Sequence, residues 1–169
     1  MDDARNEFLT ETVEHQSESG RDGNLGRNFV SVFVAGQLFG IPVLTVQAVL
    51  GPQPMTRIPL APPEVAGSLN LRGRIVTAID LRTRLGLEPR PAGDGGMNVV
   101  VEVGAELYSL IVDTVGEVES FAAEDQAHIP PTLDPRWRQI VDGIYRLDDR
   151  LMIVANVTKL IELRYAKAA

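Results

Sequence analysis

The 169-residue chain contains no cysteine and only two histidines, His15 and His128. The lack of cysteine excludes disulfide bonds, thiolate metal sites and cysteine nucleophiles. Two histidines cannot supply a three-histidine zinc centre, so we expect no metal site. Aromatic residues make up only 5% of the chain, but 44% of its residues are hydrophobic and 23% are charged, as is ordinary for a globular protein.

Long hydrophobic runs are missing as well. No stretch of about 18 apolar residues occurs, so we expect no membrane-spanning helix and no membrane insertion. The first five residues, MDDAR, are acidic where a secretory signal peptide would need a basic end followed by an apolar stretch. We therefore expect a cytoplasmic protein.

Acidic residues outnumber basic ones, and the net charge of −7 with a pI of about 4.8 argues against binding to nucleic acid. The charge is unevenly distributed. Residues 57–90 carry six arginines against three acids, whereas residues 91–129 carry eight acids and no lysine or arginine. This is either chance clustering on a solvated surface, or a body with a basic and an acidic face suited to head-to-tail or multi-partner contacts.

The first 27 residues form a separate region by composition. They are acidic and contain several glycines and serines, which predicts a disordered tail ahead of a folded domain at residues 28–169. The alternative is a short docking helix with one apolar face formed by Ala4, Phe8, Leu9 and Val13.

An internal repeat is the most informative feature of the folded part. Residues 30–49 align with residues 99–118 at a constant offset of 69, and eight of these 20 positions are identical. Residues 67–85 align with residues 143–161 at an offset of 76. Two matches in the same order indicate two copies of one structural unit. The change in offset places extra loop in the second copy, around residues 120–139.

Each copy shows the same order of local signals. An alternating apolar strand opens it and forms the first hairpin with the strand that follows. A further apolar strand, a second hairpin and a closing helix come next. The hairpin turns are predicted at Gly36-Gln37, Ala105-Glu106, Arg72-Gly73 and Asp148-Asp149. Asp80 and Asn156 stand where each closing helix begins, and both are good N-caps because their side chains accept hydrogen bonds from the first turn.

Each unit thus contains about five short strands, which must close into a small barrel to protect their edges. The predicted fold class is mainly β, with two tandem pseudo-repeated five-stranded barrels and short helices. We place the first barrel at about residues 28–90 and the second at about 91–163. A C-terminal helix at about 156–168 is a candidate to cross back over the other barrel. Because such barrels bury little surface alone, we expect the two to pack together.

The segment Val46–Leu87, VQAVLGPQPMTRIPLAPPEVAGSLNLRGRIVTAIDLRTRLGL, resembles the CheW-type chemotaxis coupling proteins. In that family a VQEI-like strand, a TRIP-like element, G-x-x-NLRG, a VIPVIDLR-like strand and an RLGL-type end follow in this order. The later segments VDTVGEV and RLMIVANVTKLI are also similar to family elements. The resemblance covers about residues 28–163. It implies a pair of five-stranded SH3-like barrels, in agreement with the repeat.

The resemblance implies a non-catalytic adaptor in chemotaxis signal transduction. Its partners would be the regulatory domain of a CheA-type histidine kinase and the cytoplasmic tips of methyl-accepting chemoreceptors. It would be recruited to receptor arrays at the inner face of the membrane, and we expect it to be a monomer when free. The family seats the helical receptor tips between the barrels, and an apolar groove suits the apolar face of an amphipathic helix.

The NLRG hairpin holds three candidate partner-binding residues, Asn70, Arg72 and Gly73. Taken from the residues alone, Arg72 is more simply a solvated turn residue, but the resemblance places it on the receptor-coupling surface. Gly73 is expected to supply the positive φ that the turn needs.

Four valines match positions that the family associates with receptor contact: Val46, Val99, Val115 and Val118. Core packing explains them equally, and the sequence leaves both possibilities open. Ala48 stands where the family has Glu. Our hypothesis is that in family members this Glu lies near the NLRG arginine on one partner-binding surface.

The evidence for catalysis is weak. Asp113 and Glu117 would lie about 13 Å apart on a strand, too far for a retaining carboxylate pair. No nucleophile–base set and no phosphate-binding glycine loop is present, so we expect no catalytic residue and no cofactor. Two alternatives stay open. One is a double-barrel regulator that binds the kinase but not receptors, and the weaker one is an acid-base enzyme using the carboxylates of residues 91–129.

Overall fold

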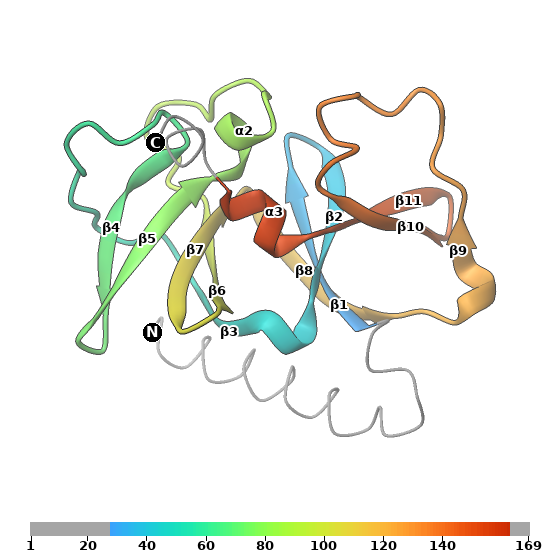
Figure 1. The fold of residues 1–169 in the computed structure, drawn as a ribbon, viewed down its shortest axis with the longest axis horizontal. Helices are drawn as coiled ribbons and strands as arrows, with labels where there is room; N and C mark the ends of the chain where they lie inside the picture. The colour runs from blue at the N-terminus through green and yellow to red at the C-terminus, as the bar shows by residue number, and fades with distance from the viewer. Residues whose placement is uncertain (1–27, 163–169) are drawn as a thin grey trace.

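The computed structural model describes residues 28–162 (Figure 1). The predicted tail at residues 1–27 and the part of the predicted C-terminal helix beyond residue 162 lie outside this range. Within it, no helix combines the length and the apolar character that crossing a membrane would require.

Two β-sheets make up most of the described chain, which confirms the mainly β fold class. Sheet A has six strands in the order β8-β1-β2-β11-β10-β9, and sheet B has five in the order β3-β6-β7-β5-β4. The strands of sheet A are β1 (Asn28–Val34), β2 (Gln37–Pro42), β8 (Thr114–Ser120), β9 (Gln126–Ala127), β10 (Val141–Leu147) and β11 (Arg150–Ala155). The strands of sheet B are β3 (Val46–Leu50), β4 (Val65–Leu71), β5 (Arg74–Asp80), β6 (Met97–Val103) and β7 (Glu106–Val112). The helical elements are η2 (Val43–Thr45), α2 (Leu81–Arg84), η3 (Ala123–Asp125) and α3 (Val157–Ile161).

The predicted repeat is confirmed element by element. β1 and β2 correspond to β6 and β7 at the offset of 69, and β4, β5 and α2 correspond to β10, β11 and α3 at the offset of 76. The predicted extra loop around residues 120–139 contains η3 and β9. β9 is the sixth strand of sheet A, which the repeat did not predict.

The two repeats exchange their first hairpins. Sheet A combines β1 and β2 of the first repeat with β8, β10 and β11 of the second, and sheet B combines β6 and β7 of the second repeat with β3, β4 and β5 of the first. Parallel pairing joins each exchanged hairpin to its new sheet, with Ile153 opposite Phe39 and Thr77 opposite Tyr108. The predicted division into barrels at about residue 90 is therefore wrong, because each sheet needs both halves of the chain.

Short connections produce this exchange. Only Asp113 lies between β7 and β8, and only Val43–Thr45 lies between β2 and β3. A single residue is too few even for a two-residue hairpin turn. The chain therefore continues from one sheet into the other instead of folding back on the strand that it has just left.

Three apolar clusters stabilise the fold. The largest contains buried residues from strands of both sheets, among them Val32, Phe39, Ile41, Ile79, Val99, Leu110, Val112 and Ile153. A second cluster belongs to sheet B and includes Ala48, Leu69, Val76, Val100 and Leu107. A third belongs to sheet A and includes Phe29, Leu38, Phe121, Tyr145 and Met152. The expected packing of the two units on each other is confirmed by the shared cluster.

The hairpin turns confirm two of the four predicted positions. Arg72-Gly73 and Asp148-Asp149 join their strands as expected, because Leu71 pairs with Arg74 and Leu147 with Arg150. The other two turns lie one residue earlier than predicted, at Ala35-Gly36 and Gly104-Ala105. In both, glycine adopts a positive φ, 81° at Gly36 and 64° at Gly104, and this requirement sets the register.

Both predicted helix caps are confirmed. The Asp80 carboxylate accepts a hydrogen bond from the backbone N–H of Arg82 at 2.9 Å, and the Asn156 side chain accepts one from the N–H of Lys159 at 3.0 Å. α3 ends at Ile161, earlier than the predicted residue 168, and Glu162 is extended. The Arg84 side chain of α2 donates to the carbonyl of Leu160, so the helices of the two repeats meet.

Asp113, at the crossing from sheet B to sheet A, anchors an ion-pair network. Its carboxylate accepts hydrogen bonds from Arg82 at 2.6 Å and 2.9 Å, from Arg90 at 3.2 Å and from the backbone N–H of Ala35 at 2.7 Å. Arg90 also pairs with Asp80 at 3.2 Å. Burial raises the pKa of Asp113, but the hydrogen bonds from Arg82, Ala35 and Arg90 outweigh burial and lower the pKa below its ordinary value. We call these four side chains, Asp80, Arg82, Arg90 and Asp113, the crossing cluster.

The exchange of hairpins predicts that neither half of the chain folds alone. Fragments 1–92 and 93–169, separated in the exposed loop before β6, should each lack cooperative thermal unfolding by circular dichroism, because each lacks strands that its sheets require. When mixed, they should recover the β spectrum and a cooperative transition. A cooperative transition in either fragment alone would contradict the exchanged arrangement.

The crossing cluster predicts a pH-dependent contribution to stability. Asp113→Asn should lower the free energy of unfolding at pH 7 by about 1–3 kcal/mol, because two guanidinium groups lose their charged partner. Since the folded-state pKa lies below the unfolded value of about 3.9, the contribution is complete above that pH and lost as the pH falls through the folded pKa. Urea unfolding of parent and variant should therefore differ at pH 7 and converge towards pH 2. A difference that does not change with pH would show that the charge is unimportant.

Candidate functional site

The hairpin between β4 and β5 ends in a turn that the structure holds firmly. The side-chain oxygen of Asn70 accepts a hydrogen bond from the backbone N–H of Gly73 at 2.8 Å. Arg72 and Gly73 both adopt positive φ, 52° and 85°, which is the geometry of a tight two-residue turn. The structure thus confirms the expected backbone role of Gly73 and gives Asn70 a positioning role beside Arg72.

Arg72 is exposed at the tip of this hairpin. Among residues 28–162, none forms an ion pair with it. Its neighbour Arg74 donates to the carbonyl of Ala105 at 3.1 Å, so the hairpin tip is tied to the turn between β6 and β7. The arginine at position 72 is therefore a free cation on a fixed support.

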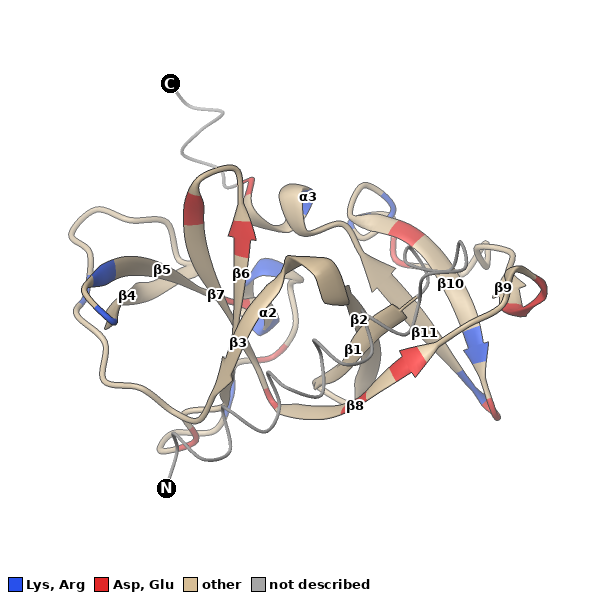
Figure 2. Ribbon diagram, turned by 90° about the horizontal axis from the view of Figure 1, so that it is seen from below, with Lys and Arg blue, Asp and Glu red and all other residues tan. Residues whose placement is uncertain are grey.

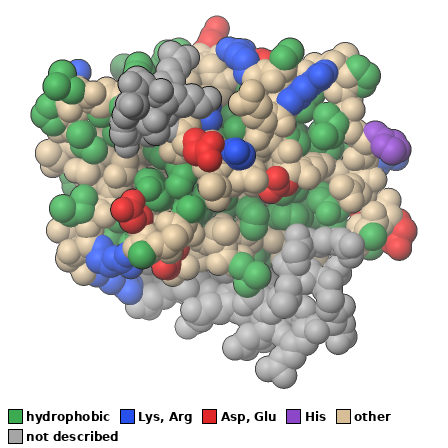
Figure 3. Space-filling model, viewed as in Figure 1, with side chains coloured by type: hydrophobic (Ala, Val, Ile, Leu, Met, Phe, Trp, Pro, Cys, Tyr) green, Lys and Arg blue, Asp and Glu red, His purple; other side chains and the backbone are tan. Residues whose placement is uncertain are grey.

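A hollow of about 490 Å³ lies beside the hairpin. Its walls are formed by Gln53, Pro54, Met55, Thr56, Ser68, Leu69, Asn70 and Ile75. Ile75 is 77% exposed although the next residue, Val76, is fully buried. Ile75 is an apolar residue at a strand position that faces away from the core, and this pattern indicates a contact with a partner. The alternation of the strand in the sequence contains this signal, but the sequence analysis missed it. Figure 3 shows hydrophobic side chains beside basic ones at this end of the molecule.

The four candidate valines do not share one environment. Val46, Val115 and Val118 are half-buried and pack against the cluster that joins the two sheets. Val99 belongs to the interior of that cluster and is 0% exposed. Val99 was a candidate for direct contact with a partner, and its burial shows instead that it packs in the core. The other three valines keep enough exposure for such a contact.

Ala48 is buried, at 8% exposure, in the apolar cluster of sheet B. The same cluster includes Leu69 and packs against Leu71, which directly precedes Arg72. Position 48 is thus close to the strand that carries the arginine. The expectation that position 48 lies on a partner-binding surface is corrected for this chain, because Ala48 is buried.

Acidic residues lie on β8 of sheet A and also on β6 and β7 of sheet B. Figure 2 shows them along β8, in contrast to the basic β4–β5 hairpin of sheet B. Burial raises the pKa of Glu119, and the nearby charges of Glu117 and Asp148 raise it further. Both sheets carry both signs of charge, so the sheets do not divide the molecule into a basic and an acidic face.

The carboxylates of residues 91–129 do not form a catalytic constellation. Asp113 is engaged by Arg82 and Arg90 in the crossing cluster, and Glu117 is exposed on β8. Asp80 acts as a helix cap, as predicted. Across the described part of the chain, no group of three or more acidic or histidine side chains could hold a metal ion.

Comparison with known proteins places the chain among chemotaxis proteins. The profile of the CheW-like domain matches residues 28–164. The chemotaxis protein CheW of Klebsiella aerogenes is 28% identical over 137 residues, which cover 81% of this chain and 82% of that protein. CheW of Helicobacter pylori is 24% identical, with 91% of this chain and 96% of that protein covered. The crystal structure of the scaffolding protein TtCheW from Thermoanaerobacter tengcongensis superposes with a TM-score of 0.73 at 29% identity, covering 82% of this chain and 94% of that one.

The turn geometry predicts different outcomes for two substitutions at Gly73. Gly73→Ala should lower the free energy of unfolding by about 1 kcal/mol, since an L-residue is strained at φ 85° although open space surrounds the new Cβ. Gly73→Asn should restore most of the loss, because Asn tolerates this backbone region better. Urea denaturation of the three proteins measures both effects. Equal stability of all three would show that the turn is not fixed.

Proposed function

This chain belongs to the CheW-like domain family and is a chemotaxis adaptor, and from this premise we propose that it couples chemoreceptors to a histidine kinase. The proposed partners are the cytoplasmic tips of methyl-accepting chemoreceptors and the regulatory domain of a CheA-type kinase. The exposed cation of Arg72 is the observation that carries the proposal. It stands on a turn that Asn70 fixes through the N–H of Gly73, beside a hollow lined by both polar and apolar side chains.

The apolar groups at this end of the molecule supply affinity, and the cation supplies selectivity. The exposed side chain of Ile75 and the walls of the hollow offer surface that a partner removes from water, at about 25 cal/mol per Å². Arg72 favours a partner with a carboxylate opposite it and disfavours one with a cation there. Association with such a partner should therefore depend on salt.

The half-buried valines support a separate contact with a helical receptor tip. Val46, Val115 and Val118 lie on β3 and β8, one strand from each sheet, and Leu44 in η2, just before β3, is 62% exposed. An apolar strip of this kind fits the apolar face of an amphipathic helix. Two contacts on different parts of one rigid body are what an adaptor requires.

In this proposal the protein has no catalytic activity and needs no cofactor. It works in the cytoplasm as a monomer and is recruited to receptor arrays at the inner face of the membrane. A regulator that binds the kinase but not the receptors is the main alternative, and the binding experiment below separates the two.

Arg72→Glu should weaken partner binding while leaving the fold intact. A carboxylate in place of the cation should raise the Kd by about 30-fold or more, equivalent to about 2 kcal/mol. The thermal melt should barely change, because Arg72 makes no ion pair among residues 28–162. Titration against a receptor-tip fragment and a kinase regulatory domain measures the effect on each.

Arg146→Glu is the matched control for this experiment. Arg146 is an exposed arginine on β10, and its substitution by Glu makes the same change of charge in the other sheet. It should leave both affinities close to those of the parent. If Arg72→Glu binds both partners as the parent does, Arg72 is only a turn residue. If the parent binds the kinase but no receptor tip, the chain is the kinase-only regulator.

A further inference from the structure

Each exchanged hairpin meets strands that are equivalent in the two sheets. In sheet A, β2 pairs with β11, and Gly40 lies opposite Val154. In sheet B, β7 pairs with β5, and Ser109 lies opposite Ala78, which are the equivalents of the first pair at the offsets of 69 and 76. Short connections send each hairpin out of its own repeat, but both sheets, in one chain or in two copies, offer it a similar place. Side chains must therefore distinguish the right sheet from the wrong one.

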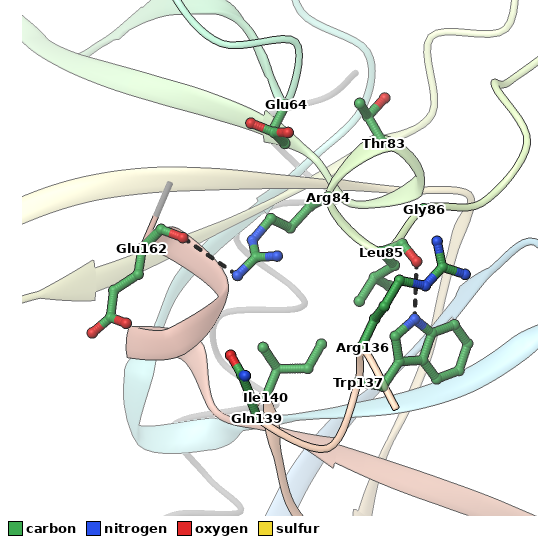
Figure 4. Close-up of a pocket in the computed structure, with 10 residues that line it drawn as sticks. All are labelled: Glu64, Thr83, Arg84, Leu85, Gly86, Arg136, Trp137, Gln139, Ile140 and Glu162. Carbon is green, nitrogen blue, oxygen red and sulfur yellow. Dashed lines mark hydrogen bonds between the residues drawn. The ribbon is translucent and has the colours of Figure 1, made fainter. Parts of the chain in front are cut away.

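The contacts between the closing elements of the repeats do not make this distinction. In the wall of the cavity where α2 and α3 meet (Figure 4), the indole N–H of Trp137 donates to the carbonyl of Leu85 at 2.9 Å. The guanidinium of Arg84 donates to the carbonyls of Leu160 at 2.8 Å and Glu162 at 3.3 Å. None of these five residues belongs to an exchanged hairpin. The distinction has to come from residues of the hairpins and of the strands that receive them.

In sheet A, a glycine of the β1–β2 hairpin makes room for a methionine of β11. Gly40 is buried, and a Cβ atom at this position would lie 2.7 Å from Sδ of Met152 and 3.1 Å from Cβ of Phe29. Met152 and Phe29 are 0% and 2% exposed, so neither side chain can turn into solvent. The φ of Gly40 is not positive, so its backbone conformation does not require glycine. The lack of space therefore restricts position 40 to glycine.

In sheet B, a buried polar pair occupies the equivalent place of the β6–β7 hairpin. The hydroxyl of Ser109 donates to the side-chain oxygen of Asn98 at 2.8 Å, and the amide of Asn98 donates to the carbonyl of Gly51 at 3.0 Å. Ser109 and Asn98 are both 0% exposed. Gly51 directly follows β3. The pair therefore fixes the hairpin to a strand of sheet B through a hydrogen bond that a buried amide needs.

The two places differ in both size and polarity, and the equivalent residues are Phe29, Gly40 and Met152 in sheet A, and Asn98, Ser109 and Val76 in sheet B. If the β6–β7 hairpin entered sheet A, the Cβ of Ser109 would meet the sulfur of Met152. The amide of Asn98 would lose the carbonyl of Gly51. It would face the rings of Phe121 and Tyr145 instead, because these rings pack against Phe29. Overpacking and an unpaired buried amide both oppose this placement.

We propose that these six residues, the packing key, assign each first hairpin to its sheet. Gly40 admits the β1–β2 hairpin beside Met152, and the hydrogen bond from Asn98 to Gly51 retains the β6–β7 hairpin in sheet B. The key opposes entry of a hairpin into the wrong sheet, both within a chain and between copies. A wrong exchange between copies would join different surfaces head to tail and would continue without closing. The packing key thus keeps a protein built from exchanged hairpins monomeric, and it does not depend on the proposed function.

A double-mutant cycle in the full chain tests the sheet A part of the packing key. Gly40→Ser should lower the melting temperature by roughly 3–10 °C through overpacking, and Met152→Val should lower it by roughly 2–8 °C through the cavity that it leaves. In the Gly40→Ser background, Met152→Val should instead raise the melting temperature, because valine leaves room for the serine side chain. Failure of Met152→Val to raise it there, including failure of both proteins to fold, would overturn the proposal.

Gly143→Ser is the matched control for this cycle. Gly143 is buried in the same sheet, but a Cβ atom there would make only ordinary contacts, at 3.5 Å with Gln126 and 3.9 Å with Tyr145. In the Gly143→Ser background, Met152→Val should lower the melting temperature as it does in the parent. A rise in that background too would show that the rescue is not specific to position 40, and the proposal would be wrong.

Refolding tests the assignment itself. The double variant Gly40→Ser, Met152→Val has at both positions the residue types of sheet B, so sheet A no longer excludes the β6–β7 hairpin by size. Refolded from urea at increasing protein concentration, it should form a growing fraction of oligomers with a β spectrum, whereas the parent and Gly143→Ser should return as monomers. Light scattering and circular dichroism measure both properties. Equal oligomer fractions in the double variant and the parent at every concentration would show that the packing key does not assign the hairpins.

Discussion

Between β7 and β8 the chain has a single residue, Asp113, and between β2 and β3 it has only the three residues of η2. These two connections send each first hairpin into the sheet of the other repeat. The composition of the largest apolar cluster follows from this exchange, because the cluster contains residues from strands of both sheets and both repeats. A protein built in this way has two barrels that cannot separate, since separation would remove strands from each of them. The shared strands therefore fix the relative orientation of surfaces on the two sheets, and no large interface between independent domains is needed.

The same connection explains why Asp113, whose pKa is lowered, has a structural role. Asp113 lies at the point where the chain leaves sheet B for sheet A, and its backbone N–H donates to the carbonyl of Phe33 in β1 at 2.9 Å. Its carboxylate satisfies the N–H of Ala35 in the first hairpin turn, and two guanidinium groups offset the burial of its charge. A perturbed pKa often marks an active site, but here every lone pair is taken by a structural donor. The reading of these acids as catalytic has no geometric support.

The sequence predicted the inventory of elements better than their arrangement. The repeat offsets of 69 and 76 identified corresponding strands and both helix caps, because period-two alternation and Asp or Asn caps are local signals. The exchange of hairpins could not be predicted from the repeat, since each hairpin meets equivalent strands in either sheet and the pattern is the same for both. Val99 lies on one of the exchanged hairpins, so its burial could not be predicted from the repeat either. Arg72 and Gly73 were identified because a turn at Arg-Gly is local, whereas the hollow beside them depends on residues 53–56, which pack there only in the fold.

The two second hairpins show how one scaffold becomes asymmetric. At the offset of 76, the turn residues Arg72 and Gly73 correspond to Asp148 and Asp149, so the equivalent turns carry opposite charge, although Arg146 and Arg150 flank the second turn. The backbone is the same at both tips, with positive φ at Arg72 and at Asp148. Asp148 also contributes to the raised pKa of Glu119, which places the second tip beside the acids of β8. In the proposed adaptor, a partner carboxylate would meet a cation at the first turn and two aspartates at the second, whereas apolar surface alone would not distinguish the two ends of a pseudo-symmetric body. The charge of the turn residues therefore distinguishes two hairpins that the shared backbone makes alike.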